Sequence, residues 1–370
     1  MPPPIPPRVR LQIDCSPTLC PEERTEWQAF MHAAQHQHPR QDPRFAAVEE
    51  ADGRSVLYVT GRGSDGALRA AGLFSLRRYP ALSSIFIDAS CLSGPVCDDA
   101  ETLVDFLEGV RRLPPFARVG RVRATPFWTD QEADTLARVF VARGWRIDEA
   151  EPFRQTGWVD LTPRTEDILA AFSKSARREL RRAERQGIVL RQLTRPSEAR
   201  DFLASLNRLR TSRGLRSLPE PGFLKAFETI HADGDTGVIL GAFHGDDFVS
   251  GLQLYRGRFV AHGRHFTLEP ERLHALSNLR IAPLVWYEGM LWAKAQGCRA
   301  LDVEGWRATV QEGDSSFGIH KYKGELAPAP VRRIAEHGRT ANPIIDVARS
   351  AGSHLRNLAR HTLRRMKGRT

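Results

Sequence analysis

The most concentrated set of side chains suited to binding a substrate lies between Lys174 and Arg185. This stretch carries six Lys or Arg residues against two acids. Arg177 and Arg181 are four residues apart, so on a helix they share one face, with Lys174 about one turn before them. Guanidinium groups in a row are suited to bidentate binding of phosphate or carboxylate. The stretch predicts either an anion-binding helix or a solvated, salt-bridged surface helix.

A glycine-rich segment, Gly61–Gly66, matches the dinucleotide-binding pattern G-x-G-x-x-G. That pattern binds a pyrophosphate only where a helix begins directly after the glycines. The following residues, Ala67–Leu76, instead have the composition of a strand, so we interpret the segment as a hairpin turn. The sequence contains no Walker A, His-Glu-x-x-His or Gly-x-Ser-x-Gly motif, which removes the common phosphate-loop, zinc-protease and serine-hydrolase functions.

Length and cysteine content limit the class of protein. At 370 residues the chain is longer than one hydrophobic core usually organises, so we expect two domains. The cysteines are odd in number and form no Cys-x-x-Cys pair, so neither a disulfide framework nor a metal site is predicted. The segment Met1–Arg10 is proline-rich and lacks the apolar stretch of a secretory signal, and no apolar run is long enough to span a bilayer. We therefore expect a cytoplasmic protein.

The positive charge is concentrated near the C-terminus. The formal net charge is +10, and from Arg339 onward eight Lys or Arg residues face one acid, Asp346, which accounts for +7 of it. Apolar residues recur at helical spacing between Asn342 and Arg369, so this tail is expected to form a basic amphipathic helix. Such a helix is suited to peripheral contact with an anionic membrane or with tRNA, or it packs on its own domain.

A weak internal repeat is the clearest large-scale feature of the sequence. Val56–Thr60 and Leu68–Leu76 have the pattern of two strands joined by a turn, and Val238–Phe243 and Phe248–Tyr255 repeat this hairpin in the second half. Each hairpin is followed by a further strand, a helix-length segment and another strand. These segments are Ser84–Asp88, Asp99–Arg112 and Val119–Ala124 in the first half and Arg258–His265, Ser277–Gln296 and Ala300–Val303 in the second.

The repeat predicts an α/β (α+β) fold with two similar domains. An antiparallel hairpin that leads into alternating helix and strand is typical of a mixed, mostly antiparallel sheet flanked by helices. We place the first domain at residues 1–160 and the second at residues 161–338. The second would begin with a basic junction helix at residues 163–186, and residues 339–370 would form the tail.

Several blocks of the sequence resemble the Fem-type aminoacyltransferase family. Lys174–Val189 is similar to that family's Lys-x-x-Arg-x-x-hydrophobic-Arg helix, and it follows a strand that ends at Leu161, as in the family. Four further blocks resemble the family's motifs in the family's order: Ser93–Asp98, Arg121–Pro126, Trp292–Gly305 and Gly318–Gly324. The resemblance covers most of residues 25 to 335 and implies two tandem GNAT-like domains. The sequence is similar to the shorter members that lack the long coiled-coil arm.

The resemblance also implies a reaction. Fem-type enzymes move an amino acid from aminoacyl-tRNA to an amine on the stem peptide of a peptidoglycan precursor, which is a nucleotide- or lipid-linked muropeptide. No cofactor is then expected, and the donor would be aminoacyl-tRNA rather than acetyl-CoA. The absence of the Arg/Gln-x-x-Gly-x-Gly/Ala loop, with which GNAT enzymes hold the acetyl-CoA pyrophosphate, agrees with this. A polyanionic donor also fits the basic composition.

The resemblance assigns roles to individual residues. Lys323, which follows the aromatic Tyr322, occupies the position of the charge that stabilises the tetrahedral oxyanion. Asp98 and Asp302 are the candidate carboxylates that take a proton from the attacking amine, with Asp98 assigned to catalysis and Asp302 to the substrate site. Both aspartates have an alternative role in ordering a turn.

The basic helix completes these assignments. Arg177, Arg181 and Lys174 are assigned to the phosphates or carboxylates of the acceptor. Two other functions remain open: an acyl-CoA-dependent GNAT enzyme that acts on an amine or sugar, and a non-catalytic RNA-binding protein with a GNAT-like scaffold.

Overall fold

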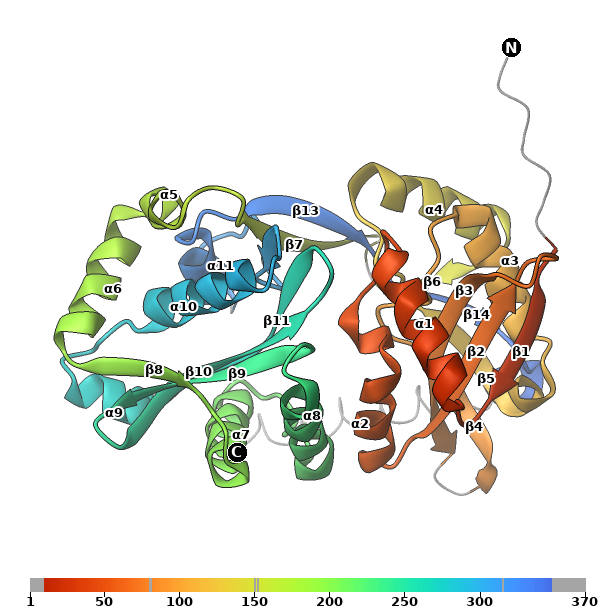
Figure 1. Ribbon diagram of the computed structural model, residues 1–370, viewed down its shortest axis with the longest axis horizontal. Helices are drawn as coiled ribbons and strands as arrows, with labels where there is room; N and C mark the ends of the chain where they lie inside the picture. Colours follow the sequence, from red (N-terminus) through yellow and green to blue (C-terminus); the bar gives the residue numbers. More distant parts are fainter. Residues whose placement is uncertain (1–9, 80–81, 150, 152, 315, 348–370) are drawn as a thin grey trace, which may run out of the picture. The chain divides into compact units, whose positions relative to one another are not determined.

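The chain folds into two structural units, and the first unit contains both the N-terminal and the C-terminal segments of the chain. Unit 1 comprises Met1–Pro152 and Ile334–Thr370, and unit 2 comprises Phe153–Arg333. Figure 1 shows a computed structural model of the chain, which describes residues 10–79, 82–149, 151, 153–314 and 316–347. The predicted tail helix lies outside these residues from position 348 onward. No helix in the described part of the chain is long and apolar enough to cross a membrane.

Unit 1 is built on a mixed seven-stranded sheet. Its strands are β1 (Gln12–Ser16), β2 (Ser55–Arg62), β3 (Leu68–Tyr79), β4 (Leu82–Cys91), β5 (Val119–Ala124), β6 (Arg146–Ile147) and β14 (His337–Thr340). Its helices are α1 (Pro21–Ala33), α2 (Ala46–Ala51), α3 (Ala100–Val110) and α4 (Asp130–Ala142). The strand order is β1-β2-β3-β4-β5-β14-β6, in which β4 and β5 are parallel and the other neighbours for which a register is known are antiparallel.

Unit 2 repeats this plan. Its strands are β7 (Phe153–Asp160), β8 (Ile188–Gln192), β9 (Gly237–His244), β10 (Asp247–Arg256), β11 (Val260–Leu268), β12 (Ala300–Asp302) and β13 (Ala329–Ile334). Its helices are α5 (Thr165–Ala171), α6 (Lys174–Arg185), α7 (Pro196–Ser212), α8 (Glu220–Asp233), α9 (Pro270–Ala275), α10 (Ala282–Ala295) and α11 (Phe317–Gly324). The strand order is β13-β7-β12-β11-β10-β9-β8, and β11 and β12 are parallel.

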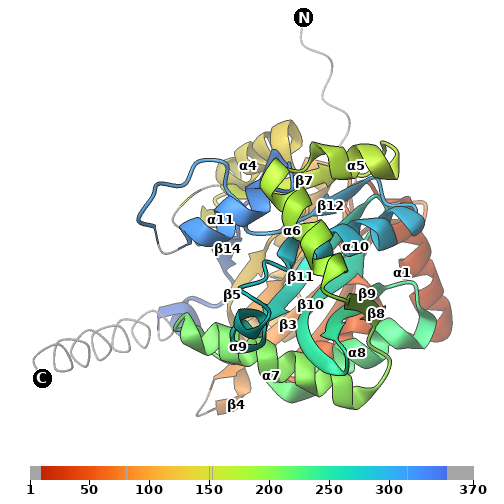
Figure 2. The ribbon, with the colours of Figure 1, turned by 90° about the vertical axis from the view of Figure 1, so that its left-hand side faces the viewer.

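Helices cover both faces of each sheet because the strands carry apolar residues on both faces. In unit 2, Gly251 of β10 lies against Phe202 of α7, whereas the neighbouring Leu252 and Leu254 lie against Gly289 of α10. Figure 2 shows α7 and α8 on one side of this sheet and α6 and α10 on the other.

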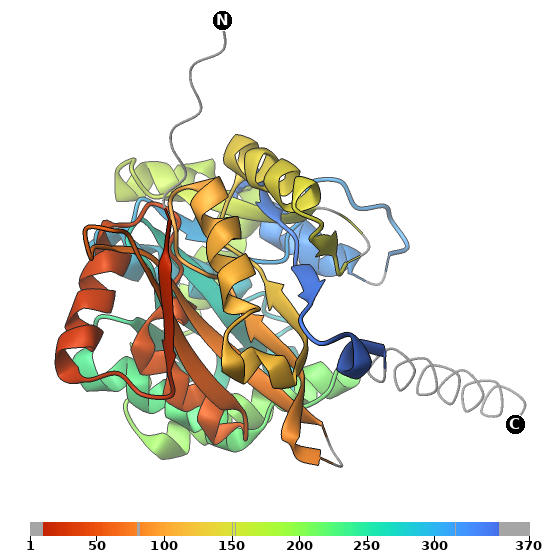
Figure 3. The ribbon, with the colours of Figure 1, turned by 90° about the vertical axis from the view of Figure 1, so that its right-hand side faces the viewer.

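Unit 1 is layered in the same way. Gly61 of β2 lies against Phe106 of α3, while Tyr58 of the same strand contacts Trp27 of α1 edge to face. Figure 3 shows α3 and α4 over one face of the sheet and α1 over the other. The predicted α/β class with two tandem mixed sheets is therefore confirmed.

The predicted repeat is present as expected. Both hairpins lie where the sequence placed them, and the glycine-rich segment forms the end of β2 and a turn in which the Gly63 amide donates to the Ala67 carbonyl at 2.9 Å. One helix is shorter than predicted. It begins at Ala282 instead of Ser277, because Ser277 and Asn278 adopt positive φ angles of 58° and 57° that a helix does not accommodate.

The division between the units differs from the predicted domain boundaries in two places. Strand β7, which the prediction placed in the first domain, pairs with β12 and so belongs to the sheet of unit 2. Strand β14, which straddles the predicted end of the second domain, pairs with β5 and β6 in unit 1. The sequence pattern predicted β7 as a strand but not β14, and strand partners at long range are not encoded in local pattern.

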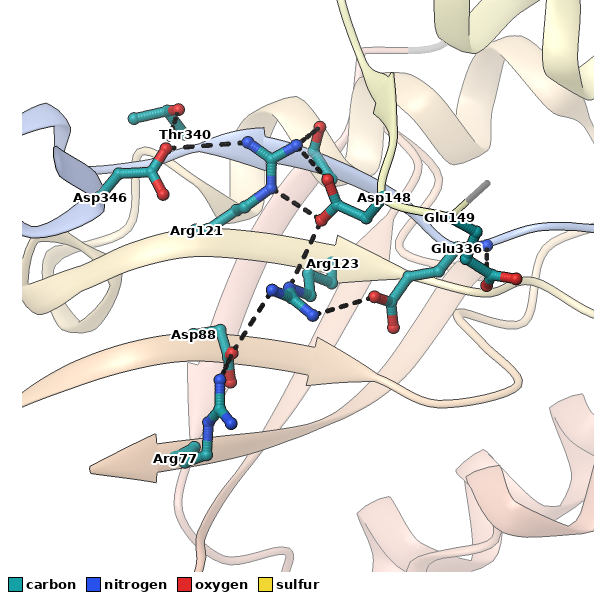
Figure 4. A network of polar contacts seen from close by, with 10 residues as sticks. Arg77, Asp88, Arg121, Arg123, Asp148, Glu149, Glu336, Thr340 and Asp346 are labelled. Carbon is teal, nitrogen blue, oxygen red and sulfur yellow. Dashed lines mark hydrogen bonds and ion pairs between the residues drawn. The ribbon is translucent and has the colours of Figure 1, made fainter. Parts of the chain in front are cut away.

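A network of ion pairs connects neighbouring strands of the unit 1 sheet (Figure 4). Arg121 of β5 makes a bidentate contact with Asp148, with distances of 2.8 Å from Nε to Oδ2 and 2.5 Å from Nη2 to Oδ1. Arg123, two residues along the same strand, pairs with Glu336 at 3.1 Å and with Asp88 of β4 at 3.8 Å. These contacts tie β4 and β5 together on one face of the sheet.

The same network holds the last described residues of the chain. Asp346 accepts a hydrogen bond from the Thr340 hydroxyl at 2.5 Å and lies 3.7 Å from Arg121. At the other end of the network, Arg77 of β3 contacts Asp88, and its side chain is 56% exposed compared with 10% for Arg121. The network thus runs from a buried centre to an exposed end.

Removal of the buried arginine is expected to destabilise unit 1 more than removal of the exposed one. Arg121→Ala should lower the free energy of unfolding by about 3 kcal/mol, because it leaves the buried Asp148 carboxylate with only the longer contact to Arg123 at 3.4 Å. Arg77→Ala should cost less than about 1 kcal/mol, since the Arg77 side chain is largely solvated and the buried Asp88 keeps its contact with Arg123 at 3.8 Å. Urea unfolding of both variants measures the difference, and equal losses would contradict a network with a buried centre.

Candidate functional site

The two parallel strand pairs differ in how far they stay together. In unit 1, β4 and β5 remain paired from Phe86 opposite Val119 to Cys91 opposite Ala124. In unit 2, β11 and β12 pair only as far as His262 opposite Asp302. Beyond that point the chain turns toward β7, where the Val303 amide donates to the Gly157 carbonyl at 2.9 Å. In unit 2 the two parallel strands β11 and β12 therefore separate at the carboxyl end of β12. We call the line between such a parallel pair the seam, and the seam of unit 2 is open at this end.

A cavity of about 680 Å³ lies at this opening. Its walls come from the end of α7, from β11, from Trp286 of α10, from residues 303–305 and from α11. The apolar lining residues are Leu206, Leu209, Leu215, Phe266, Leu268, Trp286, Val303 and Ile319. The charged lining residues are Arg210, Arg213, Arg264, Glu304 and Lys323. Four cations against one acid make the cavity suited to an anionic ligand that also has an apolar part.

Helix α11 carries Lys323 into the cavity. Asp314 accepts hydrogen bonds from the amide and the hydroxyl of Ser316, the residue before the helix, at 2.9 and 2.8 Å, which favours helix initiation there. Trp306 fixes the helix from the side, since its indole Nε1 donates to the His320 carbonyl at 3.0 Å. Lys323 lies in the last turn, where the partial negative charge of a helix C-terminus favours a cation.

The ammonium of Lys323 makes no ion pair with any residue in the described part of the chain. Its Nζ donates to the backbone carbonyl of Glu304 and lies 5.9 Å from the centre of the Trp286 ring. Burial lowers the pKa of Lys323 to about 8, while Glu304 and Asp302 oppose this shift and Arg213 adds to it. An ammonium has three N–H groups, so donors remain for a ligand in the cavity.

An aromatic wall stands beside this lysine. Tyr322 lines the cavity, and its ring centre lies 6.0 Å from that of Phe266, which in turn lies 6.1 Å from that of Trp286. Burial raises the pKa of the Tyr322 phenol, so it stays protonated at any physiological pH. This wall excludes water from one side of the lysine and so accounts for part of the desolvation.

Asp302 lies beneath the cavity. Its side chain is fully buried, with Oδ1 accepting from the Thr156 hydroxyl at 2.5 Å and from the Glu304 amide at 2.8 Å. Burial alone would raise the pKa of Asp302, but His262 and Arg333, each 3.8 Å from Oδ2, outweigh this and lower it. The carboxylate is therefore charged and holds the turn whose carbonyl binds Lys323.

This position of Asp302 differs from the one expected of a substrate-binding group. A carboxylate with no exposed surface orders the turn at Glu304 and Gly305, whose φ angles of 44° and 52° are positive. It acts on a ligand only through Glu304 and Lys323. The contacts of Asp302 therefore support its alternative role, which is to order a turn.

The other predicted residues do not line the cavity. Lys174, Arg177 and Arg181 lie on α6, which packs against α10. Arg177 donates to the Ala170 carbonyl. Asp98 lies in unit 1, where Oδ1 accepts from the amides of Gln35 and His36 at 2.9 and 3.0 Å and so orders the loop after α1.

Of the cavity residues, Tyr322 and Lys323 were predicted, and the unpredicted ones include Arg213, Arg264, Trp286 and Glu304. Glu304 lies inside the quoted block Trp292–Gly305, so the block contained the signal without pointing to this position. Arg213 belongs to a basic run that surrounds Gly214 after α7, and such a run is a usable signal. Arg264 and Trp286 are isolated in the sequence and come to the cavity only through the sheet and α10.

Comparisons with known proteins agree with this architecture. Residues 170–323 match the protein family described as the acetyltransferase (GNAT) domain. The crystal structure of FemX is similar with a TM-score of 0.75 and 13% sequence identity, and the match covers 91% of this chain and 100% of that chain. No curated protein sequence matches the chain.

Two further solved structures are similar over most of their length. A tandem GNAT protein from the clavulanic acid biosynthesis pathway has a TM-score of 0.54 and 14% identity, covering 90% of this chain and 99% of that chain. The structure of L-PGS from Bacillus licheniformis has a TM-score of 0.50 and 14% identity, covering 91% of this chain and 96% of that chain.

The two similar sheets and these comparisons define a protein with the tandem GNAT fold. Unit 1 and unit 2 are its two GNAT-like domains. Within this class, the chain is similar to FemX along nearly the whole length of both chains, so the predicted resemblance to the Fem-type family is confirmed at the level of the fold.

Replacement of Asp302 is expected to change the pKa of Lys323. Asp302→Asn keeps an oxygen that accepts from Thr156 and Glu304 but removes a negative charge that raises the pKa of Lys323, so this pKa should fall below about 8. The chain has only six lysines, Lys174, Lys225, Lys294, Lys321, Lys323 and Lys367, so NMR titration of ¹³C-methylated protein resolves them. The exposed carboxylate variant Asp160→Asn is the control, and equal Lys323 pKa values in both variants would contradict the coupling.

Proposed function

We propose that the chain is an aminoacyltransferase that moves an amino acid from aminoacyl-tRNA to an amine of a peptidoglycan-precursor stem peptide. The observation that carries this proposal is the ammonium of Lys323 at the open seam of unit 2, where no carboxylate of the described residues is bonded to it. The sequence resemblance supplies the donor and acceptor. The acetyltransferase-type family match and the likeness to FemX support acyl transfer in general.

The chemistry is aminolysis of an ester. The acceptor nitrogen attacks the ester carbonyl carbon, a C–N bond forms, and negative charge develops on the carbonyl oxygen. The C–O bond to the ribose then breaks, and the proton lost by the amine ends on the departing ribose oxygen. Lys323 meets the need for a positive donor beside the developing oxyanion, and the dry aromatic wall beside it strengthens that interaction.

A carboxylate near the cavity helps the amine to lose its proton. Glu304 is the acid among the lining residues, so we assign this role to Glu304 rather than to Asp98. The oxygens of Asp98 are engaged by the amides that follow α1, which suits a structural role. Arg213 and Arg264, which have no ion-pair partner among the described residues, provide charge for the phosphate at the donor's 3′ end.

The direct test is transfer by the purified chain. With charged total tRNA and a nucleotide-linked muropeptide, we expect the muropeptide to gain the mass of one amino acid, and ribonuclease should abolish this gain. Lys323→Met should lower the rate by about 10² to 10³-fold, the usual cost of losing an oxyanion donor. Lys321→Met is the matched control, because Lys321 is exposed and stacks on Phe317 outside the cavity.

The pH dependence of kcat provides a second test of the role of Lys323. Lys323 is charged below its pKa of about 8, so kcat should fall as the pH rises through that value. Lys323→Arg keeps its charge at higher pH and should lose this limb of the profile. Acetyl-CoA consumption that ribonuclease does not affect, with no mass gain from any aminoacyl-tRNA, would instead identify an acyl-CoA-dependent enzyme.

A further inference from the structure

Helix α6 presents a row of cations to solvent. Lys174, Arg178, Arg181 and Arg185 are spaced by four, three and four residues, which places them on one side of the helix, and all four are exposed. We call these four residues the α6 stripe. The opposite side of the helix carries Ala176, Leu180 and Ala183, which are buried in the core of unit 2. The orientation of the stripe is therefore fixed by packing.

The charge of the stripe is largely uncompensated. Buried Glu179 pairs with Arg178 at 3.3 Å and with Arg182 at 3.4 Å. Across the residues that the structure describes, Lys174, Arg181 and Arg185 have no carboxylate within ion-pair distance. Many other arginines of the chain do have one, so this surface differs from an ordinary salt-bridged face.

The placement of these cations works against helix stability. The first turn of α6 contains no acid, although acids in the first turn are favoured by the helix dipole and occur in α1, α3, α4 and α5. Like charges four residues apart also destabilise a helix, by about 0.2–0.5 kcal/mol per pair. A local departure from helix rules of this kind points to a function that a bound polyanion would satisfy.

The stripe starts beside the segment that carries Lys323. The Ser173 amide, at the start of α6, donates to the Glu325 carbonyl at 2.9 Å. Arg280 joins the same two segments, with Nη1 donating to the Ser175 hydroxyl at 3.1 Å and Nη2 pairing with Glu325 at 2.7 Å. A polymer whose end binds at Lys323 therefore lies close to the first residues of the stripe.

We propose that the α6 stripe binds the phosphate backbone of the RNA donor outside the acceptor site. This inference rests on the proposed function for the identity of the donor. Cations about one turn apart, ~5.4 Å, over a length of ~16 Å match a repeating polyanion rather than a single phosphate or carboxylate. An anionic membrane is less suited, because a membrane-binding helix exposes apolar side chains beside its cations and those of α6 are buried.

The proposal revises the role first assigned to the basic helix. Arg177 is not part of the stripe, since it is partly buried and bonded to the Ala170 carbonyl. Lys174 and Arg181 remain binding residues, but for the donor rather than for the acceptor. Arg178 and Arg185 join them.

The test measures binding of deacylated total tRNA to the full chain as a function of potassium chloride concentration. The stripe variant combines Lys174→Gln, Arg178→Gln, Arg181→Gln and Arg185→Gln. The matched control removes the same charge from exposed arginines of unit 1, by Arg10→Gln, Arg112→Gln, Arg118→Gln and Arg138→Gln. The logarithm of the association constant falls as the logarithm of the salt concentration rises. The stripe variant should reduce the magnitude of this negative slope by about 3, and the control variant should reduce it by less than about 1.

A milder double variant, Arg181→Gln with Arg185→Gln, covers the case in which the fourfold variant fails to fold, and its slope should fall by about 1.5. Equal slopes for stripe and control variants would overturn the proposal. So would an unchanged tRNA slope together with lost binding to phosphatidylglycerol vesicles, which would identify a membrane surface. The assay needs no transfer, so a chain that binds tRNA through the stripe but transfers nothing would overturn the proposed function alone.

Discussion

The site depends on one interaction, the hydrogen bond from the Lys323 ammonium to the backbone carbonyl of Glu304. A carboxylate at that place would neutralise the charge and hold the pKa of the lysine high. A carbonyl orients the ammonium without neutralising it, and burial beside Trp286 brings the pKa down to about 8. The lysine is thus charged at neutral pH and available to a developing negative charge. Asp302 serves this arrangement from below by holding the turn.

The two units share a fold but differ at their parallel strand pairs. In unit 1 the parallel strands β4 and β5 stay paired, and Arg123 links across to Asp88 on the neighbouring strand. In unit 2 the equivalent strands part after Asp302, and the cavity occupies the space between them. A repeated fold therefore supports one open seam among the described residues, and the charges that close the other seam serve stability.

Much of the fold was predictable because it is encoded locally. Alternating apolar residues and turn glycines placed both hairpins, and the order of elements predicted mixed sheets. The partners of β7 and β14 were not predictable, since long-range pairing leaves no local signal. At the site, Lys323 and Tyr322 were found through a motif, whereas Trp286 was not, because it reaches the cavity only through packing. The burial of Asp302 was equally invisible, since an Asp at a strand end has the same sequence pattern whether buried or exposed.

The central claim is that the cavity at Lys323 receives the acylated end of the donor RNA. Periodate-oxidised tRNA carries a dialdehyde on its terminal ribose, which forms an imine with a neutral lysine nearby that borohydride traps. A lysine with a pKa of about 8 is well suited to this reaction, and peptide mapping distinguishes it from the five other lysines of the chain. We expect cross-linking at Lys323 that is lost in Lys323→Met and retained in Lys321→Met. Cross-links confined to other lysines, such as Lys174 or Lys225, would contradict it.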